Sequence, residues 1–192
     1  MKLIFATQNQ NKATEIQSLM PQGIEILSLQ DIGCDDDIPE TATTLDGNAQ
    51  LKARYIAEKF KVNVFADDTG LEIEALNNEP GVYSARYAGE QKNSEENMQL
   101  VLEKLAGITN RGAQFRTAIC LIIDGSEHLF EGIVKGEIRM EKSGNEGFGY
   151  DPIFEPEYCG KTFAEMSMSE KNERSHRGRA FQKMIHFLNH LP

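Results

Sequence analysis

The chain has 192 residues, of which 40% are hydrophobic and 26% are charged, and its formal net charge is −10. This length suits one compact domain or one domain with two lobes, and no apolar run reaches the length of a membrane-spanning helix. The negative charge argues against broad binding to nucleic acid or to an anionic membrane. Three cysteines without CxxC or zinc-type spacing favour free thiols in a reducing, cytoplasmic setting.

The first part of the chain predicts strands and helices in alternation. In order, we expect a strand, a polar loop, a helix, a second helix and a buried strand, at residues 2–7, 8–11, 12–19, 46–60 and 62–66. The second helix carries its apolar residues on one stripe. The buried strand is expected to end at Asp67-Asp68-Thr69-Gly70, where acidic residues and glycine favour a turn.

The later part of the chain predicts a helix, a hairpin and a final helix. Ser94 is a candidate N-cap, with Glu95 and Glu96 in the first helical turn. Asp124-Gly125 is a hairpin signal between two expected strands at residues 113–123 and 128–140. A final helix is expected at residues 177–190. Alternation followed by a hairpin indicates an α/β fold with a mixed sheet.

Two polar segments near the first strands could hold an anionic ligand or a metal. The loop from Thr7 to Lys12 could donate to phosphate oxygens, although it lacks the glycines of a P-loop and could simply cap a helix. Asp67 and Asp68 could serve a Mg²⁺ ion together with Glu40, or could form a tight turn. Neighbouring residues of a strand face opposite ways, so the two aspartates are expected to do different work.

Two later segments could contact a flat ligand. Gly144–Pro152 places three glycines around Phe148 and Tyr150, so that an aromatic ring could stack on a base or fill the core. Ser175-His176-Arg177 stands at the start of the last helix and offers several hydrogen-bond donors, although a lone histidine is more often structural.

Seven segments in a fixed order span nearly the whole chain: Ala6–Lys12, Glu40-Thr41, Asn48–Arg54, Ala66–Leu71, Pro80–Gly89, Gly147–Pro152 and Ser175–Gly178. Together they resemble the family of inosine/xanthosine triphosphate pyrophosphatases. The resemblance implies one pyrophosphatase domain over residues 1–192, with an elongated, two-lobed α/β fold. A long twisted mixed sheet flanked by helices and a central active-site cleft belong to that expectation, as does a homodimer.

The resemblance also implies the reaction and its residues. ITP, dITP and XTP would be hydrolysed to the monophosphate and pyrophosphate with Mg²⁺, with Asp68 activating the attacking water. Glu40, Asp67 and Asp68 would serve the metal, and which aspartate touches it stays open. The implied substrate-binding residues are Thr7, Asn9, Lys12, Lys52, Thr69, Phe148, Gly149, Tyr150, Asp151, Lys171, His176 and Arg177.

One departure and two rival interpretations accompany this hypothesis. Gln8 stands where the family often has glycine or asparagine, which puts the loop geometry in question more than the reaction. A hydrolase for modified pyrimidines or standard triphosphates, or a nucleotide-binding regulator without turnover, are the alternatives. A 6-oxo group distinguishes inosine and xanthosine from adenosine, whereas rejection of guanine requires a further feature near position 2.

Overall fold

The computed structural model describes residues 1–9, 12, 16, 20 and 22–191, so most of the helix expected at 12–19 lies outside the described residues. The chain forms two compact units. Unit 1 comprises Met1–Asp68, Thr117–Gly132 and Gly178–Pro192, and unit 2 comprises Thr69–Arg116 and Ile133–Arg177. Whether they act as one pyrophosphatase domain stays a prediction.

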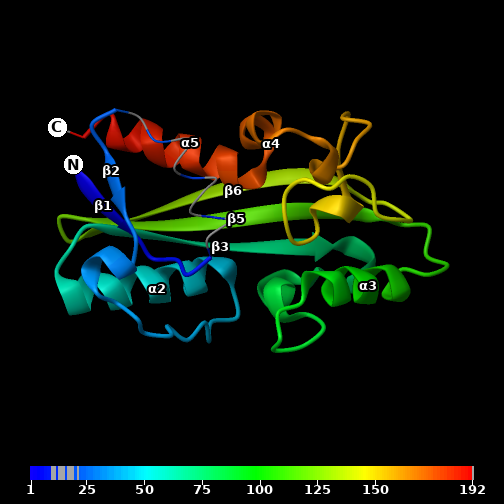
Figure 1. The fold of residues 1–192 in the computed structure, drawn as a ribbon, viewed down its shortest axis with the longest axis horizontal. Coiled ribbons are helices and arrows are strands. Elements are labelled where there is room, and N and C mark those ends of the chain that lie inside the picture. Colours follow the sequence, from blue (N-terminus) through cyan, green and yellow to red (C-terminus); the bar gives the residue numbers. More distant parts are fainter. Residues whose placement is uncertain (10–11, 13–15, 17–19, 21, 192) are drawn as a thin grey trace. The chain divides into compact units, whose positions relative to one another are not determined.

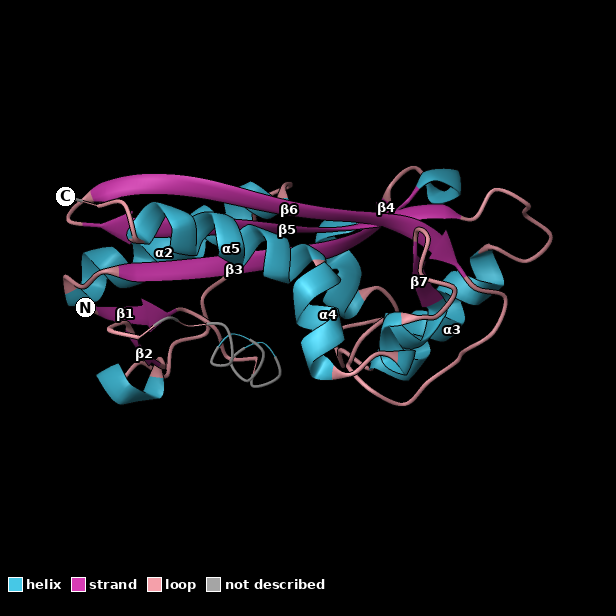
Figure 2. Cartoon of the chain, turned by 90° about the horizontal axis from the view of Figure 1, so that it is seen from above, coloured by secondary structure: helices cyan, strands magenta, loops and turns pink. Residues whose placement is uncertain are grey.

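Among the described residues, seven strands form one mixed sheet in the order β2-β1-β3-β5-β6-β7, with β4 paired to β3 (Figures 1 and 2). β1 pairs in parallel with β2 and β3, whereas β3–β4 and β6–β7 are antiparallel. The strands are β1 Lys2–Phe5, β2 Glu25–Leu27, β3 Val64–Ile73, β4 Glu79–Pro80, β5 Gly112–Ile123, β6 Ser126–Ile138 and β7 Phe154–Pro156.

Four α-helices are described: α2 Leu45–Phe60, α3 Ser94–Lys104, α4 Met168–Arg174 and α5 His176–Leu188. Short 3₁₀ helices occupy Gln30–Ile32, Glu74–Leu76, Gly81–Arg86, Asp151–Ile153 and Phe163–Glu165. None of the described helices combines the length and the apolar character needed to cross a bilayer. The predicted α/β fold, a mixed sheet flanked by helices, is confirmed.

In unit 1, alternate residues of β1 and β3 pack against different helices. Phe5 and Phe65 stack with ring centroids 4.5 Å apart, and both rings meet Phe181 of α5 edge-on. Their chain neighbours Ile4 and Ala66 belong instead to the core under α2. Figure 1 shows α5 and α2 on opposite sides of these strands. The period of two along a strand thus divides unit 1 into two apolar layers.

Unit 2 has its own core, in which α3 packs on the sheet. Val101 of α3 and Leu105, which directly follows the helix, are fully buried with Leu71 and Ile73 of β3. Asn93, and not Ser94, caps α3, because its side-chain oxygen accepts hydrogen bonds from the backbone N–H groups of Glu95 and Glu96. The expected cap was therefore one residue late, because asparagine caps a helix as well as serine does.

The expected end of the buried strand at Asp67-Asp68 is wrong. β3 continues through both aspartates to Ile73, and no turn forms at Gly70. A Cβ on Gly70 would lie 2.5 Å from the carbonyl oxygen of Gly81, so this glycine permits close backbone approach within an extended strand. By contrast, the hairpin at Asp124-Gly125 is confirmed, with φ values of 48° and 79° that suit a type I′ turn.

Candidate functional site

The acidic cluster in unit 1 lies where β1 stops and its neighbour β3 continues. The parallel register pairs Ile4 with Val64 and Phe5 with Phe65, so the loop after β1 runs beside Asp67. Lys12, beyond this loop, places its Nζ 3.1 Å from Oδ1 and 3.0 Å from Oδ2 of Asp67. Ligands of α/β proteins gather at such carboxyl ends of parallel strands.

Asp67 and Asp68 have different partners because they are neighbours on an extended strand. Asp67 meets Lys12, whereas Asp68 Oδ2 accepts a hydrogen bond of 3.0 Å from Nδ2 of Asn48 on α2. Both aspartates are buried. The opposite orientation expected from strand geometry is therefore observed, although the chemical role of each carboxylate stays a prediction.

Helix α2 also supplies the second lysine of the cluster. Lys52 Nζ donates to the carbonyl oxygen of Asp67 at 2.8 Å and forms an ion pair with Glu40, in the segment before the helix. Three carboxylates (Glu40, Asp67 and Asp68) thus share one cluster with two lysines, a formal charge of −1. Such a group can exchange its internal ion pairs for a polyphosphate and a cation.

Burial and neighbouring charges set the ionisation of this cluster. Burial raises the pKa of Asp68 above its usual value, against the opposing attraction of Lys52 and Lys12. Burial alone would lower the pKa of Lys52, but the carboxylates of Asp68, Glu40 and Asp67 outweigh it and raise that pKa. Lys52 therefore stays charged, while Asp68 becomes a better proton acceptor than an exposed aspartate.

The loop after β1 is organised by its own side chains. Thr7 Oγ1 accepts from the Asn9 N–H at 3.1 Å, and Asn9 Oδ1 accepts from the Lys12 N–H at 3.3 Å. Gln8, the departure from the family pattern, donates from Nε2 to the carbonyl oxygen of Asp36 at 3.0 Å. The longer side chain thus ties this loop to the segment that leads to Glu40.

A second cluster of predicted residues lies in unit 2 around a buried ion pair. Lys171 Nζ and the Phe148 N–H both donate to Oδ2 of Asp151, at 2.7 and 2.8 Å. The Lys171 ammonium also lies 4.6 Å from the centre of the Phe148 ring. A Cβ on Gly147 would strike the Asp151 carboxylate at 2.1 Å, so glycine at this position makes room for the pair. Asp151 therefore fixes both the lysine and the aromatic loop.

The remaining predicted residues of unit 2 have different partners. The Arg177 guanidinium lies 5.4 Å from the Phe148 ring centre, and its NH2 group donates to Thr69 Oγ1 at 3.4 Å. The His176 ring stacks on Phe115 with centroids 4.5 Å apart. Tyr150, expected near the base, instead points into the core and donates to the carbonyl oxygen of Ser84 at 2.7 Å. Its neighbour Gly149 has a φ of 63°.

The carboxylates of unit 1 match the ligand chemistry of Mg²⁺. Among the described residues, no group of three or more His, Cys, Asp or Glu side chains forms a ready cage for a metal. Mg²⁺ bound with a polyphosphate does not need one, because it takes one or two protein carboxylates and completes its shell with water and phosphate oxygens. Glu40 and Asp67 fit that requirement.

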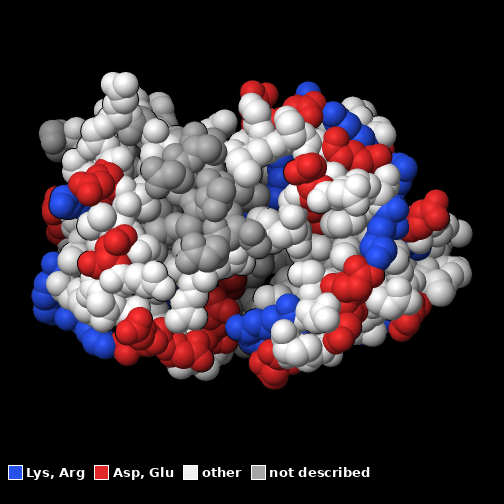
Figure 3. Space-filling model, viewed as in Figure 1, with Lys and Arg blue, Asp and Glu red and all other residues white. Residues whose placement is uncertain are grey.

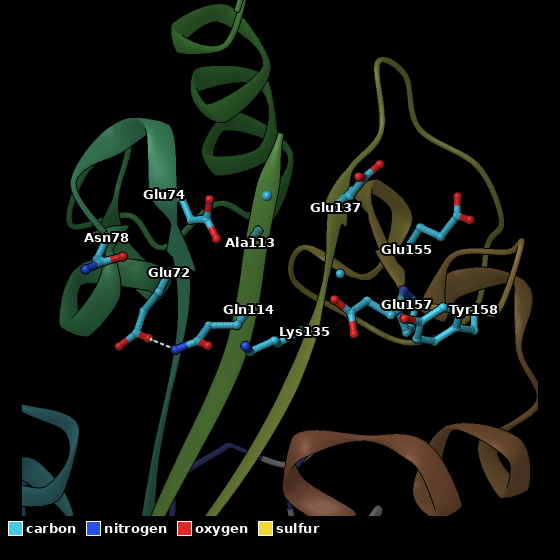
Figure 4. A pocket seen from close by; sticks show the side chains of 13 residues that line it. Glu72, Glu74, Asn78, Ala113, Gln114, Lys135, Glu137, Glu155, Glu157 and Tyr158 are labelled. Carbon is cyan, nitrogen blue, oxygen red and sulfur yellow. Dashed lines mark hydrogen bonds between the residues drawn. The ribbon is translucent and has the colours of Figure 1, made fainter. Parts of the chain in front are cut away.

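Unit 2 also has a hollow of about 500 Å³ on β3, β5, β6 and the segment after β7, distinct from the predicted residues (Figure 4). Lys135 is its one lysine among five glutamates, Glu72, Glu74, Glu137, Glu155 and Glu157. A surface of this sign repels a polyphosphate. On the face drawn in Figure 3, basic side chains are interspersed with acidic ones.

Asn48 is the site residue to which the sequence reasoning gave no role. Its side chain is 1% exposed and touches Asp68 directly. The available signal was its position four residues before Lys52, which places both side chains on one face of α2. An amide on the buried stripe of a helix indicates a specific hydrogen-bond partner.

The chain has an α/β fold, in which unit 1 carries an acid–lysine cluster beside parallel strands and unit 2 carries an aromatic–cationic cluster. The sequence profile of the Ham1 family matches residues 3–187. The chain belongs to the Ham1 family. It is 58% identical to a dITP/XTP pyrophosphatase from Flavobacterium psychrophilum, over 97% of this chain and 98% of that one.

Solved structures agree with this assignment. The Staphylococcus aureus Ham1 protein is 40% identical, with a TM-score of 0.90 over 98% of each chain. A HAM1 protein from Coxiella burnetii is 37% identical, with a TM-score of 0.92 over 100% of each chain. The family resemblance and the fold class drawn from the sequence are confirmed.

Proposed function

We propose that this protein hydrolyses non-standard purine nucleoside triphosphates, such as ITP, dITP and XTP, to the nucleoside monophosphate and pyrophosphate. The observation that carries the proposal is the cluster of Glu40, Asp67 and Asp68 with Lys12 and Lys52. The name of the relative that is 58% identical supports the same reaction.

The unit 1 cluster binds the triphosphate and performs the chemistry. The positive charges of Lys12 and Lys52, which Asp67 and Glu40 balance in this structure, offset the negative charge of the phosphates. Glu40 and Asp67 would hold a Mg²⁺ ion, which when bound offsets further charge on the phosphate oxygens.

Asp68 acts as the general base. A water molecule attacks the α-phosphorus and gives a proton to the Asp68 carboxylate, while the bond from that phosphorus to the bridging oxygen breaks. Pyrophosphate leaves with the bonding electrons, and the product retains the α-phosphate. The raised pKa of Asp68, caused mainly by burial, favours this proton transfer near neutral pH.

The unit 2 cluster recognises the base. Phe148 stacks on the purine, and Lys171 and Arg177 supply donors that suit a 6-oxo acceptor. The 6-amino group of adenine would instead set a donor against a donor. Hydrogen-bonded sites of this kind discriminate by roughly 10⁴–10⁵-fold. Thr69 holds the Arg177 side chain at this ring.

The test is a substrate panel of ITP, XTP, dITP, GTP and ATP with Mg²⁺ or with EDTA, in which pyrophosphate and orthophosphate are measured separately. We expect Mg²⁺-dependent release of pyrophosphate from ITP, dITP and XTP, with little from ATP or GTP. Orthophosphate as the product, or binding without any product, would refute the proposal in favour of a terminal phosphatase or a nucleotide-binding regulator.

The family resemblance further supports a cytoplasmic homodimer. Sedimentation equilibrium should give about twice the chain mass of 21.5 kDa. A mass equal to that of one chain would contradict this part of the proposal.

A further inference from the structure

Asn48 is a buried amide at the beginning of α2, next to the proposed general base. The helix starts after Thr44, whose side chain accepts a hydrogen bond from the Gly47 N–H at 3.1 Å. Asn48 follows with 1% of its surface exposed. Its side chain carries no charge and cannot attract phosphate as a lysine does, so its contacts must explain its place in the cluster.

Two side chains of α2 bridge the same pair of segments. Lys52 joins Glu40 to the backbone carbonyl of Asp67. One helical turn earlier, Asn48 Oδ1 accepts from the Ala42 N–H at 2.9 Å, and its Nδ2 donates to Asp68 Oδ2 at 3.0 Å. On β3, the uncharged bridge made by Asn48 ends on a side-chain carboxylate, whereas the charged bridge made by Lys52 ends on a backbone carbonyl.

The Ala42 N–H determines which way the Asn48 amide points. Because a backbone N–H can only donate, the side-chain oxygen must face it and the NH₂ group must face Asp68. Ala42 also lies close against the start of α2, since a Cβ on Gly47 would lie 2.7 Å from the Ala42 Cβ. The orientation of the Asp68 carboxylate is thus tied to the backbone through one rigid amide.

We propose that Asn48 is a positioning residue for the reaction: its amide, oriented by the Ala42 N–H, holds the Asp68 carboxylate in the plane from which it takes the proton of the attacking water. This inference rests on the proposed function. Removing the amide leaves Asp68 in place but frees its rotation, and a misplacement of about 1 Å costs on the order of 10²-fold in rate.

The experiment compares Asn48→Ala and Asn48→Leu, which keeps the branching of asparagine without its polar atoms, with Gln50→Ala. Gln50 is a matched control, because it is an amide on the same helix that donates to Glu127 Oε1 at 2.7 Å. The readouts are kcat and KM for ITP, calorimetric binding of a non-hydrolysable ITP analogue, and far-UV circular dichroism. We expect the Asn48 variants to lose roughly 10²-fold in kcat while KM and analogue affinity change less than about threefold. Gln50→Ala should behave as the wild type.

A double-mutant cycle with Asp68→Asn separates positioning from general support. If Asn48 acts through Asp68, adding Asn48→Ala to Asp68→Asn lowers kcat no more than about threefold further. Additive losses, equal losses of binding and turnover, or unfolding of both Asn48 variants would overturn the inference and leave the proposed function standing. Wild-type protein that releases no pyrophosphate from ITP would overturn both.

Discussion

The buried pair of Lys171 and Asp151 gives a stability prediction that is independent of the reaction. Their side chains are 6% and 4% exposed, and the charged atoms are 2.7 Å apart. Lys171→Met keeps most of the side-chain volume but leaves the Asp151 carboxylate buried without this cation. Breaking such a pair costs about 3–5 kcal/mol of unfolding free energy, far more than a surface pair would.

Urea unfolding followed by far-UV circular dichroism measures this loss. In a chain of this length each kcal/mol lowers Tm by about 2–4 °C, so a fall of roughly 6–20 °C is expected as well. The double variant Lys171→Met/Asp151→Asn should lose less unfolding free energy than Lys171→Met alone, because no uncompensated buried charge remains. The exposed pair of Lys142 and Glu95 is the control, and Lys142→Met should cost less than about 1 kcal/mol. An equally small loss for Lys171→Met would refute the reasoning.

The other predictions concern catalysis, base binding and thiol chemistry. Asp68→Asn should lower kcat by about 10²–10⁴-fold while calorimetry shows the ITP analogue still binding; equal losses of both would point to a metal ligand. Phe148→Ala should raise KM for ITP roughly 5–150-fold through the loss of about 1–3 kcal/mol of stacking, and an unchanged KM would exclude Phe148 from the base site. Burial raises the pKa of Cys120 from 9.0 to about 12, so at pH 8 iodoacetamide should modify the half-buried Cys159 and spare Cys120, as mass spectrometry would show. The unfolded state releases the thiol proton first, so the contribution of Cys120 to stability is complete below about pH 9 and is lost toward pH 12, which unfolding curves across that range can test.

The sequence predicted those elements whose apolar pattern repeats without interruption. The stripe on α2 and the hairpin at Asp124-Gly125 are local signals, and both match the structure. The site segments carried less information locally, since loops of asparagine, aspartate and glycine also make ordinary turns. Their resemblance to one family, as a set and in order, supplied the function.

The misplaced features depend on tertiary contacts. Gly70 has the appearance of a turn residue, but glycine is required there because the carbonyl of Gly81, eleven positions later, leaves no room for a side chain. Asn48 has no local signal for the acid that it meets, because that acid lies on another element. Tyr150 resembled a stacking residue, but its hydroxyl donates to a buried carbonyl in the distant 3₁₀ helix Gly81–Arg86. No local pattern reports such partners.

The alternation along β3 makes this strand sensitive to length as well as to composition. Removing one residue between Val64 and Asp68 would turn the following residues to the opposite face, exchanging the surroundings of both aspartates together with those of the apolar residues. Removing two would restore the faces but move the acids along the strand relative to the end of β1. Evolution can therefore change side chains in β3 far more easily than it can change the number of residues in the strand. We expect insertions and deletions among relatives to collect in loops such as residues 139–147, while the interval between these acids and the preceding helix α2 stays constant.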